Sequence, residues 1–328
     1  MRGSRLLLRT TRSVLVQVSP YSTNRTVWES KLFPLHIPGK TLQVEYGVVT
    51  LGQGDQGEGQ AGPAILAVHP AGSSYRQFSK LPGCVPDGYA SKLVGLNMLG
   101  YGKSDPWPGG QEEPTLEDLV GMVEGVMEAE GSSQKWHFLG HSMGGGLLLA
   151  GAGLMPQISP KLLSLTVFEP NLFSLLTAGD REEREQAREG ERFFDAMLAA
   201  AGREDWDAWG QTFYQFWFPG EWGSIEEGAR AKLVNTTLPS TIQEIEALKW
   251  GIDQGPGYAE KMLSNLAAVR GRKAVILSHD PGPGSHKVSL AMANILHRRA
   301  GFTIVRAPAG GHMGPVTHTN QVLPLLLG

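Results

Sequence analysis

The sequence predicts an α/β protein: a mostly parallel sheet with helices on both faces and a helical segment inserted between two strands. Short apolar runs of buried-strand length alternate with stretches of helical length along most of the chain. Glycine is abundant, with 43 residues, which suits many tight turns between strands and helices. Residues 171–255 break the alternation, because they contain several helical stretches and no convincing strand. We therefore expect a core built from residues 29–170 and 256–328 and a helical cap over 171–255.

The individual elements follow from hydrophobic period and turn residues. Leu42, Val44 and Tyr46 alternate with polar neighbours, as in a half-buried strand, and 64–68 is continuously apolar, as in a fully buried one. Strands are expected at 30–37, 41–49, 64–68, 93–96, 135–139, 162–168, 273–278 and 302–306. Helices are expected at 115–130, 142–154, 287–299 and 316–327. The glycine-rich stretch 52–62 is interpreted as a hairpin connection.

Composition excludes several functional classes. The chain has 328 residues, of which 41% are hydrophobic and 19% charged, which is typical of a globular protein. Its 29 basic and 32 acidic residues give a formal charge of −3, so no basic excess draws the folded part to nucleic acid. Cys84 is the single cysteine, which excludes an internal disulfide framework and a cysteine-rich zinc module. No run approaches the ~18 apolar residues of a spanning helix, so no stable membrane insertion is expected.

The first 28 residues have the composition of a mitochondrial transit peptide. Residues 1–28 hold five arginines, many Ser and Thr, and no acid. Arg2, Arg5, Arg9 and Arg12 share one face of a helix, opposite Leu7 and Val14. A secretory signal would need a longer apolar core than the three leucines at 6–8, and a disordered basic tail is the remaining alternative. We expect a mitochondrial protein, with the matrix as its destination and cleavage somewhere around residues 20–30.

A nucleophile elbow is the main chemical motif. Gly140-His141-Ser142-Met143-Gly144 is a G-x-S-x-G sequence between an expected strand and an expected helix. The serine must lie on a strained turn to project over the sheet edge, and the two glycines let the helix pass close to the strand. The Met143 amide then lies at a helix N-terminus, where it can stabilise an oxyanion.

Around this motif the chain resembles the α/β-hydrolase superfamily, from about residue 30 to the C-terminus. His69-Pro70-Ala71-Gly72 follows a buried strand where that family carries its oxyanion loop. The segment 100–105, GYGKSD, looks like the family's G-Y-G-x-S-D loop, and 310–314, GGHMG, lies where the family places its catalytic histidine. The chain departs from the family pattern at Pro70, where relatives usually carry Gly, and at Asn97, where many carry Asp.

The resemblance implies a triad of Ser142 as nucleophile, His312 as base and an acid. Asp280, directly after the strand 273–278, is the preferred acid, because open α/β sheets assemble their sites at strand ends. Glu169, directly after the strand 162–168, is the competitor, at an acid position that some relatives use. The backbone N–H groups of Ala71 and Met143 are the expected oxyanion donors, since Pro70 has none to offer.

Aromatic residues cluster in the expected cap, where four of the chain's eight tryptophans fall between 206 and 222. Trp206, Trp209 and Phe213 share one helical face, which Trp217 extends. The cluster is interpreted as packing of the cap on the core, as an apolar lid over Ser142, or as both. In the second case Trp209, Phe213 and Trp217 are the expected substrate contacts.

These observations predict a serine hydrolase that cleaves a carboxylic ester or thioester of a small, largely apolar acyl substrate through an acyl-enzyme. Carbon–carbon bond hydrolysis, lactone opening and acyl transfer use the same residues and remain open, as does a non-catalytic ligand-binding module with this fold. The chemistry requires no cofactor and no metal. The oligomeric state, the physiological substrate and its leaving group are not encoded in these motifs.

Overall fold

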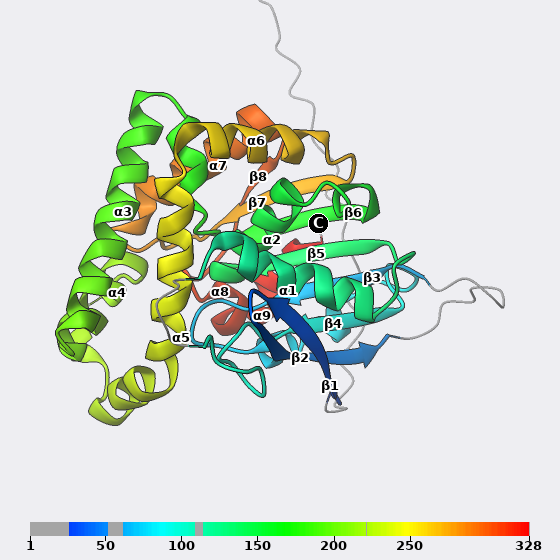
Figure 1. Ribbon diagram of the computed structural model, residues 1–328, viewed down its shortest axis with the longest axis horizontal. Helices are drawn as coiled ribbons and strands as arrows, with labels where there is room; N and C mark the ends of the chain where they lie inside the picture. Colours follow the sequence, from blue (N-terminus) through cyan, green and yellow to red (C-terminus); the bar gives the residue numbers. More distant parts are fainter. Residues whose placement is uncertain (1–25, 52–61, 109–113, 221, 328) are drawn as a thin grey trace, which may run out of the picture.

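The computed structural model describes residues 26–51, 62–108, 114–220 and 222–327, so nearly all of the expected transit peptide lies outside the described residues. The described strands form one eight-stranded sheet in the order β1-β2-β4-β3-β5-β6-β7-β8 (Figure 1). The strands are β1 (Glu29–Ile37), β2 (Lys40–Thr50), β3 (Ala64–Val68), β4 (Lys92–Leu96), β5 (Trp136–His141), β6 (Leu162–Phe168), β7 (Arg272–Leu277) and β8 (Thr303–Arg306). From β4 to β8 all neighbours run parallel, which confirms the predicted fold class.

The N-terminal strands form the antiparallel edge of the sheet. β1 and β2 make a hairpin whose turn contains Gly39 at φ +72°, and β2 pairs antiparallel with β4. The stretch 52–62 was expected to be a hairpin connection, and this expectation is wrong because β2 and β3 are not neighbours. β4 lies between them, and residues 52–61 of the connection lie outside the described residues.

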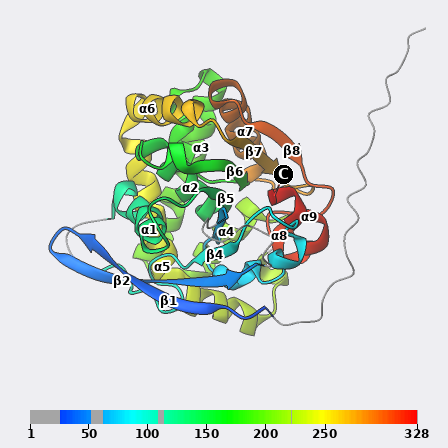
Figure 2. The same cartoon turned by 90° about the vertical axis from the view of Figure 1, so that its right-hand side faces the viewer.

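Helices cover both faces of the sheet. Alternate residues of β3 point to opposite faces: Leu66 and Val68 join one apolar cluster, and Ile65 and Ala67 the other. The first cluster includes residues of α1 (Leu116–Ala129), α2 (Met143–Leu154), α6 (Gly255–Ala268) and α7 (Ser285–Ala300). On the second face lie the short helices η1 (Tyr75–Phe78) and η2 (Leu81–Cys84) and helix α9 (Thr319–Leu327), which follows α8 (Gly314–Thr317). Figure 2 shows α1, α2 and α6 on one side of the sheet and α8 and α9 on the other.

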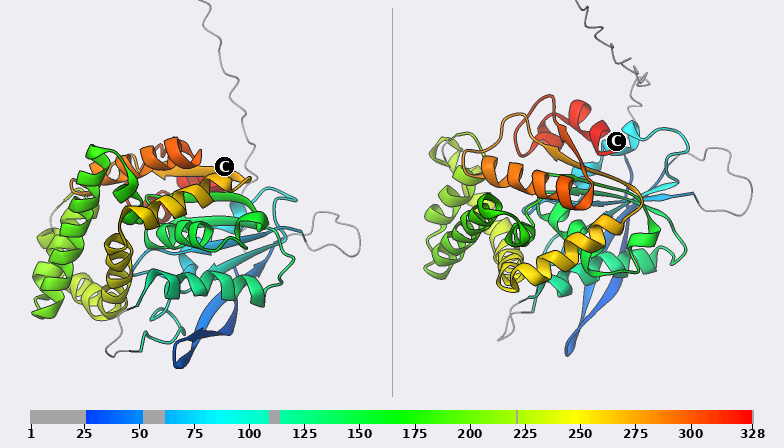
Figure 3. Two further views of the ribbon diagram at one scale, coloured as in Figure 1. Left: turned by 45° about the horizontal axis from the view of Figure 1, so that its top comes forward. Right: turned by 90° about the horizontal axis from the view of Figure 1, so that it is seen from above.

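A group of helices is inserted between β6 and β7. In chain order they are η4 (Phe173–Ala178), α3 (Arg181–Gly202), α4 (Trp206–Trp217), η5 (Trp222–Ser224) and α5 (Glu227–Asp253), with α6 following. A capping box between Asp180 and Glu183 starts α3. Figure 3 shows α3, α4 and α5 gathered at one end of the sheet. We call 171–255 the cap segment. No helix in the described part of the chain is long and apolar enough to cross a membrane.

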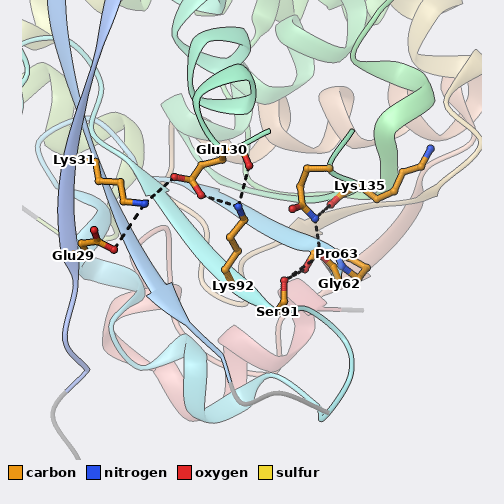
Figure 4. Close-up of polar contacts among 9 residues, drawn as sticks. Glu29, Lys31, Gly62, Pro63, Ser91, Lys92, Glu130 and Lys135 are labelled. Atoms are coloured by element: carbon orange, nitrogen blue, oxygen red, sulfur yellow. Dashed lines mark hydrogen bonds and ion pairs between the residues drawn. The ribbon is translucent and has the colours of Figure 1, made fainter. Parts of the chain in front are cut away.

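The amino ends of the parallel strands carry a polar network of their own (Figure 4). Glu130, just after α1, contacts the Lys92 amine at 2.7 Å and the Lys31 amine at 3.3 Å. Burial alone would raise the pKa of Glu130, but hydrogen bonding and charge from Lys92 outweigh it and hold the pKa below its usual value. This network joins β1, β4 and α1 at the edge of the sheet opposite the carboxyl ends of the parallel strands. We therefore interpret it as a structural network and not as part of a functional site.

Candidate active site

Ser142 lies on the strained turn that the elbow motif requires. β5 ends at His141 and α2 begins at Met143, which leaves Ser142 between them at φ +52° and ψ −115°. A non-glycine residue in such a conformation costs about 1–3 kcal/mol. A Cβ at Gly140 would lie 2.5 Å from the Gly145 Cα, and one at Gly144 would lie 2.3 Å from the Val68 carbonyl oxygen. The glycines therefore allow α2 to start directly against β3 and β5.

The loop after β8 brings His312 to this serine. The His312 Nε2 atom lies 2.9 Å from the Ser142 Oγ atom, and the Nδ1 atom lies 2.8 Å from Oε2 of Glu169. The three side chains are buried, with exposed fractions of 5% for Ser142, 3% for His312 and 1% for Glu169. With Nδ1 protonated toward the carboxylate, Nε2 can accept the serine proton. The structure thus joins a hydroxyl, an imidazole and a carboxylate in one line of hydrogen bonds.

Glu169 is held as an ion in this line. It follows β6 directly, at φ +41°, and its second oxygen, Oε1, accepts hydrogen bonds from the Ser278 hydroxyl at 2.6 Å and the Ser278 amide at 3.1 Å. Burial raises the pKa of Glu169, but the hydrogen bond and charge of His312, followed by the bonds from Ser278, bring it below its usual value. Sequence analysis missed Ser278, whose only signal was its place at a strand end.

The expected contact between Asp280 and His312 is corrected by the structure. The Asp280 side chain is 62% exposed, and its Oδ1 atom lies 4.0 Å from the Nε2 atom of the neighbouring His279. The backbone amides of His279 and Asp280 both donate to the Gly310 carbonyl oxygen, at 3.0 and 3.1 Å. The loop is therefore tied to the histidine loop through its main chain, while the carboxylate that meets His312 comes from the neighbouring strand β6.

The loop after β3 lies against the start of α2. The Gly144 amide donates to the His69 carbonyl oxygen at 3.1 Å. The His69 Nε2 atom accepts from the Met98 amide at 3.2 Å, so its Nδ1–H donates to the Pro70 carbonyl oxygen at 2.7 Å. Burial lowers the pKa of His69 to about 4, so the ring is neutral at physiological pH and acts as a brace. Ala71 follows in this loop and Met143 opens α2, so the two expected oxyanion donors come from adjoining segments.

Comparison with known proteins agrees with this architecture. Residues 63–205 match a family model described as the alpha/beta hydrolase fold. The chain has the α/β-hydrolase fold. No curated protein matches the chain in sequence.

Solved structures with the same fold are distant in sequence. An esterase from Exiguobacterium antarcticum is 14% identical, with a TM-score of 0.60 over 88% of this chain and 95% of that one. A thermophilic esterase from Thermogutta terrifontis is 16% identical, with a TM-score of 0.55 over 90% and 96%. A haloalkane dehalogenase variant from Bradyrhizobium elkanii is 14% identical, with a TM-score of 0.58 over 92% and 96%. At these identities the likeness establishes the α/β-hydrolase fold and not the reaction.

His141, the variable residue of the elbow, anchors the histidine loop of this α/β-hydrolase fold. It is fully buried, and its Nε2–H donates to the His312 carbonyl oxygen at 2.8 Å. Burial, followed by the neighbouring His312, lowers the pKa of His141 well below its usual value. A neutral His141 therefore fixes the backbone from which the His312 ring projects.

The cap segment touches the site through one aromatic residue in particular. The Trp217 ring stacks on the His312 ring, with centroids 4.1 Å apart and planes 24° from parallel. Trp209, also buried, stacks instead on Phe213 at 5.5 Å. Of the three aromatic residues expected at the substrate, Trp217 thus contacts a triad residue, whereas Trp209 and Phe213 pack together within the cap segment.

The glycines of the 280–284 loop make room for this cap contact. A Cβ at Gly282 would lie 2.3 Å from the Trp217 carbonyl carbon, and one at Gly284 would lie 2.8 Å from the Phe216 ring. The loop that sequence analysis associated with the acid therefore seats the end of α4 instead.

Asn97, the second departure from the family pattern, has a structural explanation. Its side-chain amide donates to Oε2 of buried Glu45 at 2.8 Å, and its carbonyl accepts from the Tyr75 amide at 2.9 Å. An aspartate at this position would place a second carboxylate against Glu45. No group of three or more His, Cys, Asp or Glu side chains within the described ranges is arranged to hold a metal ion.

Proposed function

We propose that this chain is a serine hydrolase that cleaves a carboxylic ester or thioester, with Ser142, His312 and Glu169 as its triad. The observation that carries the proposal is the continuous hydrogen-bonded line from the Ser142 hydroxyl through His312 to Glu169. The positive φ of Ser142 supports it, because such strain persists where function requires it. A serine in place of a carboxylate at the elbow argues against the chemistry of the haloalkane dehalogenases that share the fold.

The proposed reaction runs in two halves. The Ser142 oxygen attacks the substrate carbonyl carbon while the His312 Nε2 atom takes the hydroxyl proton, and Glu169 stabilises the imidazolium that forms. The tetrahedral intermediate collapses as His312 returns the proton to the leaving alcohol or thiol, which leaves an acyl-serine. Water then attacks the acyl carbon, His312 takes its proton, and release of the acid regenerates the Ser142 hydroxyl.

Backbone amides supply the proposed electrostatic stabilisation. The Met143 N–H opens α2, a helix of 12 residues, at its positive end. The Ala71 N–H belongs to the peptide unit whose carbonyl, on Pro70, is bound by His69. Because a peptide unit is planar, this bond also fixes the direction of the Ala71 N–H. One donor of this kind contributes roughly 10²–10³ in kcat.

Labelling by a fluorophosphonate probe tests the nucleophile. Wild-type chain is expected to react covalently, and Ser142→Ala is expected to be unlabelled at the same protein concentration and with the same thermal unfolding midpoint or a higher one. A folded wild-type chain that resists the probe would favour the non-catalytic ligand-binding module.

The substrate is proposed from the aromatic surroundings of His312. Trp217 at 4.1 Å and Phe218 at 6.2 Å between ring centroids make the wall beside the imidazole apolar. A small apolar acyl group fits such a wall better than a charged one. A panel of acyl esters and acyl thioesters of rising chain length tests this, with Trp217→Phe as the matched variant. Preference for charged acyl groups would contradict the proposal. Turnover of carbon–carbon bond substrates alone would mean that the protein is a carbon–carbon bond hydrolase instead of an esterase.

We also propose that the protein is imported into mitochondria, on the strength of the five arginines and the lack of acids in residues 1–28. A fluorescent protein fused to residues 1–28 is expected to reach the matrix, and the same fusion with Arg2, Arg5, Arg9 and Arg12 replaced by Gln is expected to stay outside. Secretion of the first fusion would refute the assignment.

A further inference from the structure

A buried tyrosine and a buried glutamate connect the cap segment to the core beside the candidate oxyanion loop. Tyr101 lies in the loop after β4, and Glu244 lies on α5. The Tyr101 hydroxyl donates to Oε2 of Glu244 at 3.3 Å, and both residues are buried. The cavity beside Glu244 is lined mainly by the apolar side chains of Met98, Leu99, Trp107, Leu119 and Met122, with Ser240 and Gln243 as its other polar residues. A carboxyl group in such a wall calls for an explanation beyond packing.

The same hydroxyl reaches the candidate oxyanion loop. The Gly72 amide donates to the Tyr101 oxygen at 3.0 Å, so the phenol lies between this amide and the carboxyl group of Glu244. Thr241, also on α5, is a second hydrogen-bond partner of the same hydroxyl. The Tyr101 ring also meets the His69 ring edge to face, with centroids 4.9 Å apart.

These contacts hold the peptide units on both sides of Ala71. His69 binds the Pro70 carbonyl, which shares a plane with the Ala71 N–H. Tyr101 binds the Gly72 N–H, which shares a plane with the Ala71 carbonyl. Gly72 is at φ +75°, a conformation that a side chain would strain, so the loop depends on external bonds to keep its direction. His69 belongs to the core, whereas Tyr101 is in turn bound by a residue of α5.

Burial of Glu244 lowers the free energy of unfolding, whereas burial of an apolar side chain would raise it. Its second oxygen, Oε1, has no hydrogen-bond partner among the described residues. Burial raises the pKa of Glu244 to about 8, so the group is kept neutral at the expense of folding free energy. An apolar residue of similar size would avoid this cost in so apolar a wall. The gain from Glu244 must therefore lie in what it holds, which is the Tyr101 hydroxyl.

We propose that Tyr101 and Glu244 are positioning residues for the oxyanion loop: docking of α5 on the core fixes the Tyr101 hydroxyl, and the hydroxyl fixes the Gly72 amide and hence the direction of Ala71. The inference rests on the proposed function, because it assigns the loop its catalytic purpose. A consequence of this arrangement is that the oxyanion site is complete only when the cap segment is docked on the core.

The test compares Tyr101→Phe, Glu244→Gln and Glu244→Leu with wild type in the full chain, using a short activated ester. Tyr101→Phe and Glu244→Leu are expected to lower kcat about tenfold or more with KM within about twofold, because small misplacement of a donor affects the transition state more than the bound ester. Glu244→Gln keeps an acceptor oxygen and is expected to stay within about threefold of wild type. Combining Tyr101→Phe with Glu244→Leu is expected to cost no more than Tyr101→Phe alone.

Tyr258→Phe is the matched control. The Tyr258 hydroxyl donates to Oε1 of Glu117 at 2.8 Å, so it also joins a tyrosine to a carboxylate between two helices, away from the oxyanion loop. It is expected to lower the unfolding midpoint without changing kcat. Hydrogen exchange of the peptide covering 69–78 gives a readout that does not depend on turnover: it is expected to accelerate in Tyr101→Phe and Glu244→Leu and not in Tyr258→Phe.

The outcomes separate the two proposals. Wild type that reacts with fluorophosphonate while Tyr101→Phe keeps the kcat of Tyr258→Phe would overturn the positioning role alone. Additive losses in the double variant, or a rise in KM at constant kcat, would also overturn it. Wild type that neither labels nor turns over any ester would overturn the proposed function, and the catalytic purpose of the pair with it.

Discussion

Replacing Glu169 by Gln gives the sharpest test of the candidate triad. Oε1 of Glu169 accepts from the Ser278 amide and Oε2 faces His312 Nδ1, so both oxygens meet a donor. A glutamine amide must turn its NH₂ group toward one of them. If the NH₂ group faces Ser278, two donors, the NH₂ group and the Ser278 backbone N–H, point at each other. If it faces His312, the imidazole must carry its proton on Nε2 instead of Nδ1, and Nε2 can then no longer accept the serine proton.

The expected loss is large, because the second orientation removes the base and both orientations remove the negative charge beside the imidazolium. A triad carboxylate changed to its amide in a serine protease lowers kcat by about 10⁴, which the rate law converts to about 5 kcal/mol. We expect kcat/KM for a short ester to fall by about 10³–10⁴ in Glu169→Gln.

Asp280→Asn is the matched control, since it makes the same chemical change at the other acid considered from the sequence. Its side chain is 62% exposed, so we expect kcat/KM to change by less than about twofold. Both variants are assayed with the same ester after their folding has been checked by circular dichroism. A hundredfold loss in Asp280→Asn together with a near-normal Glu169→Gln would refute the reasoning and require the 280 loop to move to His312 in solution.

Three further predictions follow from strain, burial and stacking. Ser142→Gly is expected to abolish turnover and to raise the free energy of unfolding by about 1 kcal/mol, measured by urea denaturation, because φ +52° costs glycine nothing. Glu244→Gln is expected to leave stability nearly unchanged at pH 4.5 and to raise it by about 2–5 kcal/mol at pH 8.5. The folded-state pKa of about 8 lies above the usual 4.5, so the wild-type penalty grows as pH rises from 4.5 to about 8 and is then constant. Trp217→Leu is expected to lower kcat/KM about 2–30-fold, because the indole face that stacks on His312 favours the imidazolium by about 0.5–2 kcal/mol and leucine has no aromatic face.

Each of these has an outcome that contradicts it. Equal stability of Ser142→Gly and Ser142→Ala would show that the elbow is not strained. A gain in Glu244→Gln that is the same at both pH values would place its origin in packing. Trp209→Leu is the control for Trp217→Leu, since Trp209 stacks on Phe213. Equal losses of kcat/KM in the two variants would mean that the cap segment as a whole, and not the ring stacked on His312, is responsible.

The sequence by itself determined the local parts of this protein. Hydrophobic period located the strands to within about two residues, and the glycines around Ser142 predicted a turn that only small residues permit. His312 was predicted because its glycine-rich loop after the last strand lies where the family that the chain resembles places its catalytic histidine. Mitochondrial import, which the N-terminal arginines indicate, remains a prediction from sequence alone.

Tertiary structure decided which side chains from distant parts of the chain contact one another. Glu169 and Asp280 both follow strands that end at the same sheet edge, and their local sequences do not say which carboxylate turns inward. The Asp280 backbone amide is bonded to Gly310 while its carboxylate is exposed, whereas Ser278 and His312 hold the Glu169 carboxylate in the interior. The link from Glu244 through Tyr101 to Gly72 joins residues up to 172 positions apart, numbered 72 and 244, and no local period encodes such a contact. Local sequence sets conformation over a few residues, whereas hydrogen bonds between distant side chains exist only after the chain has folded.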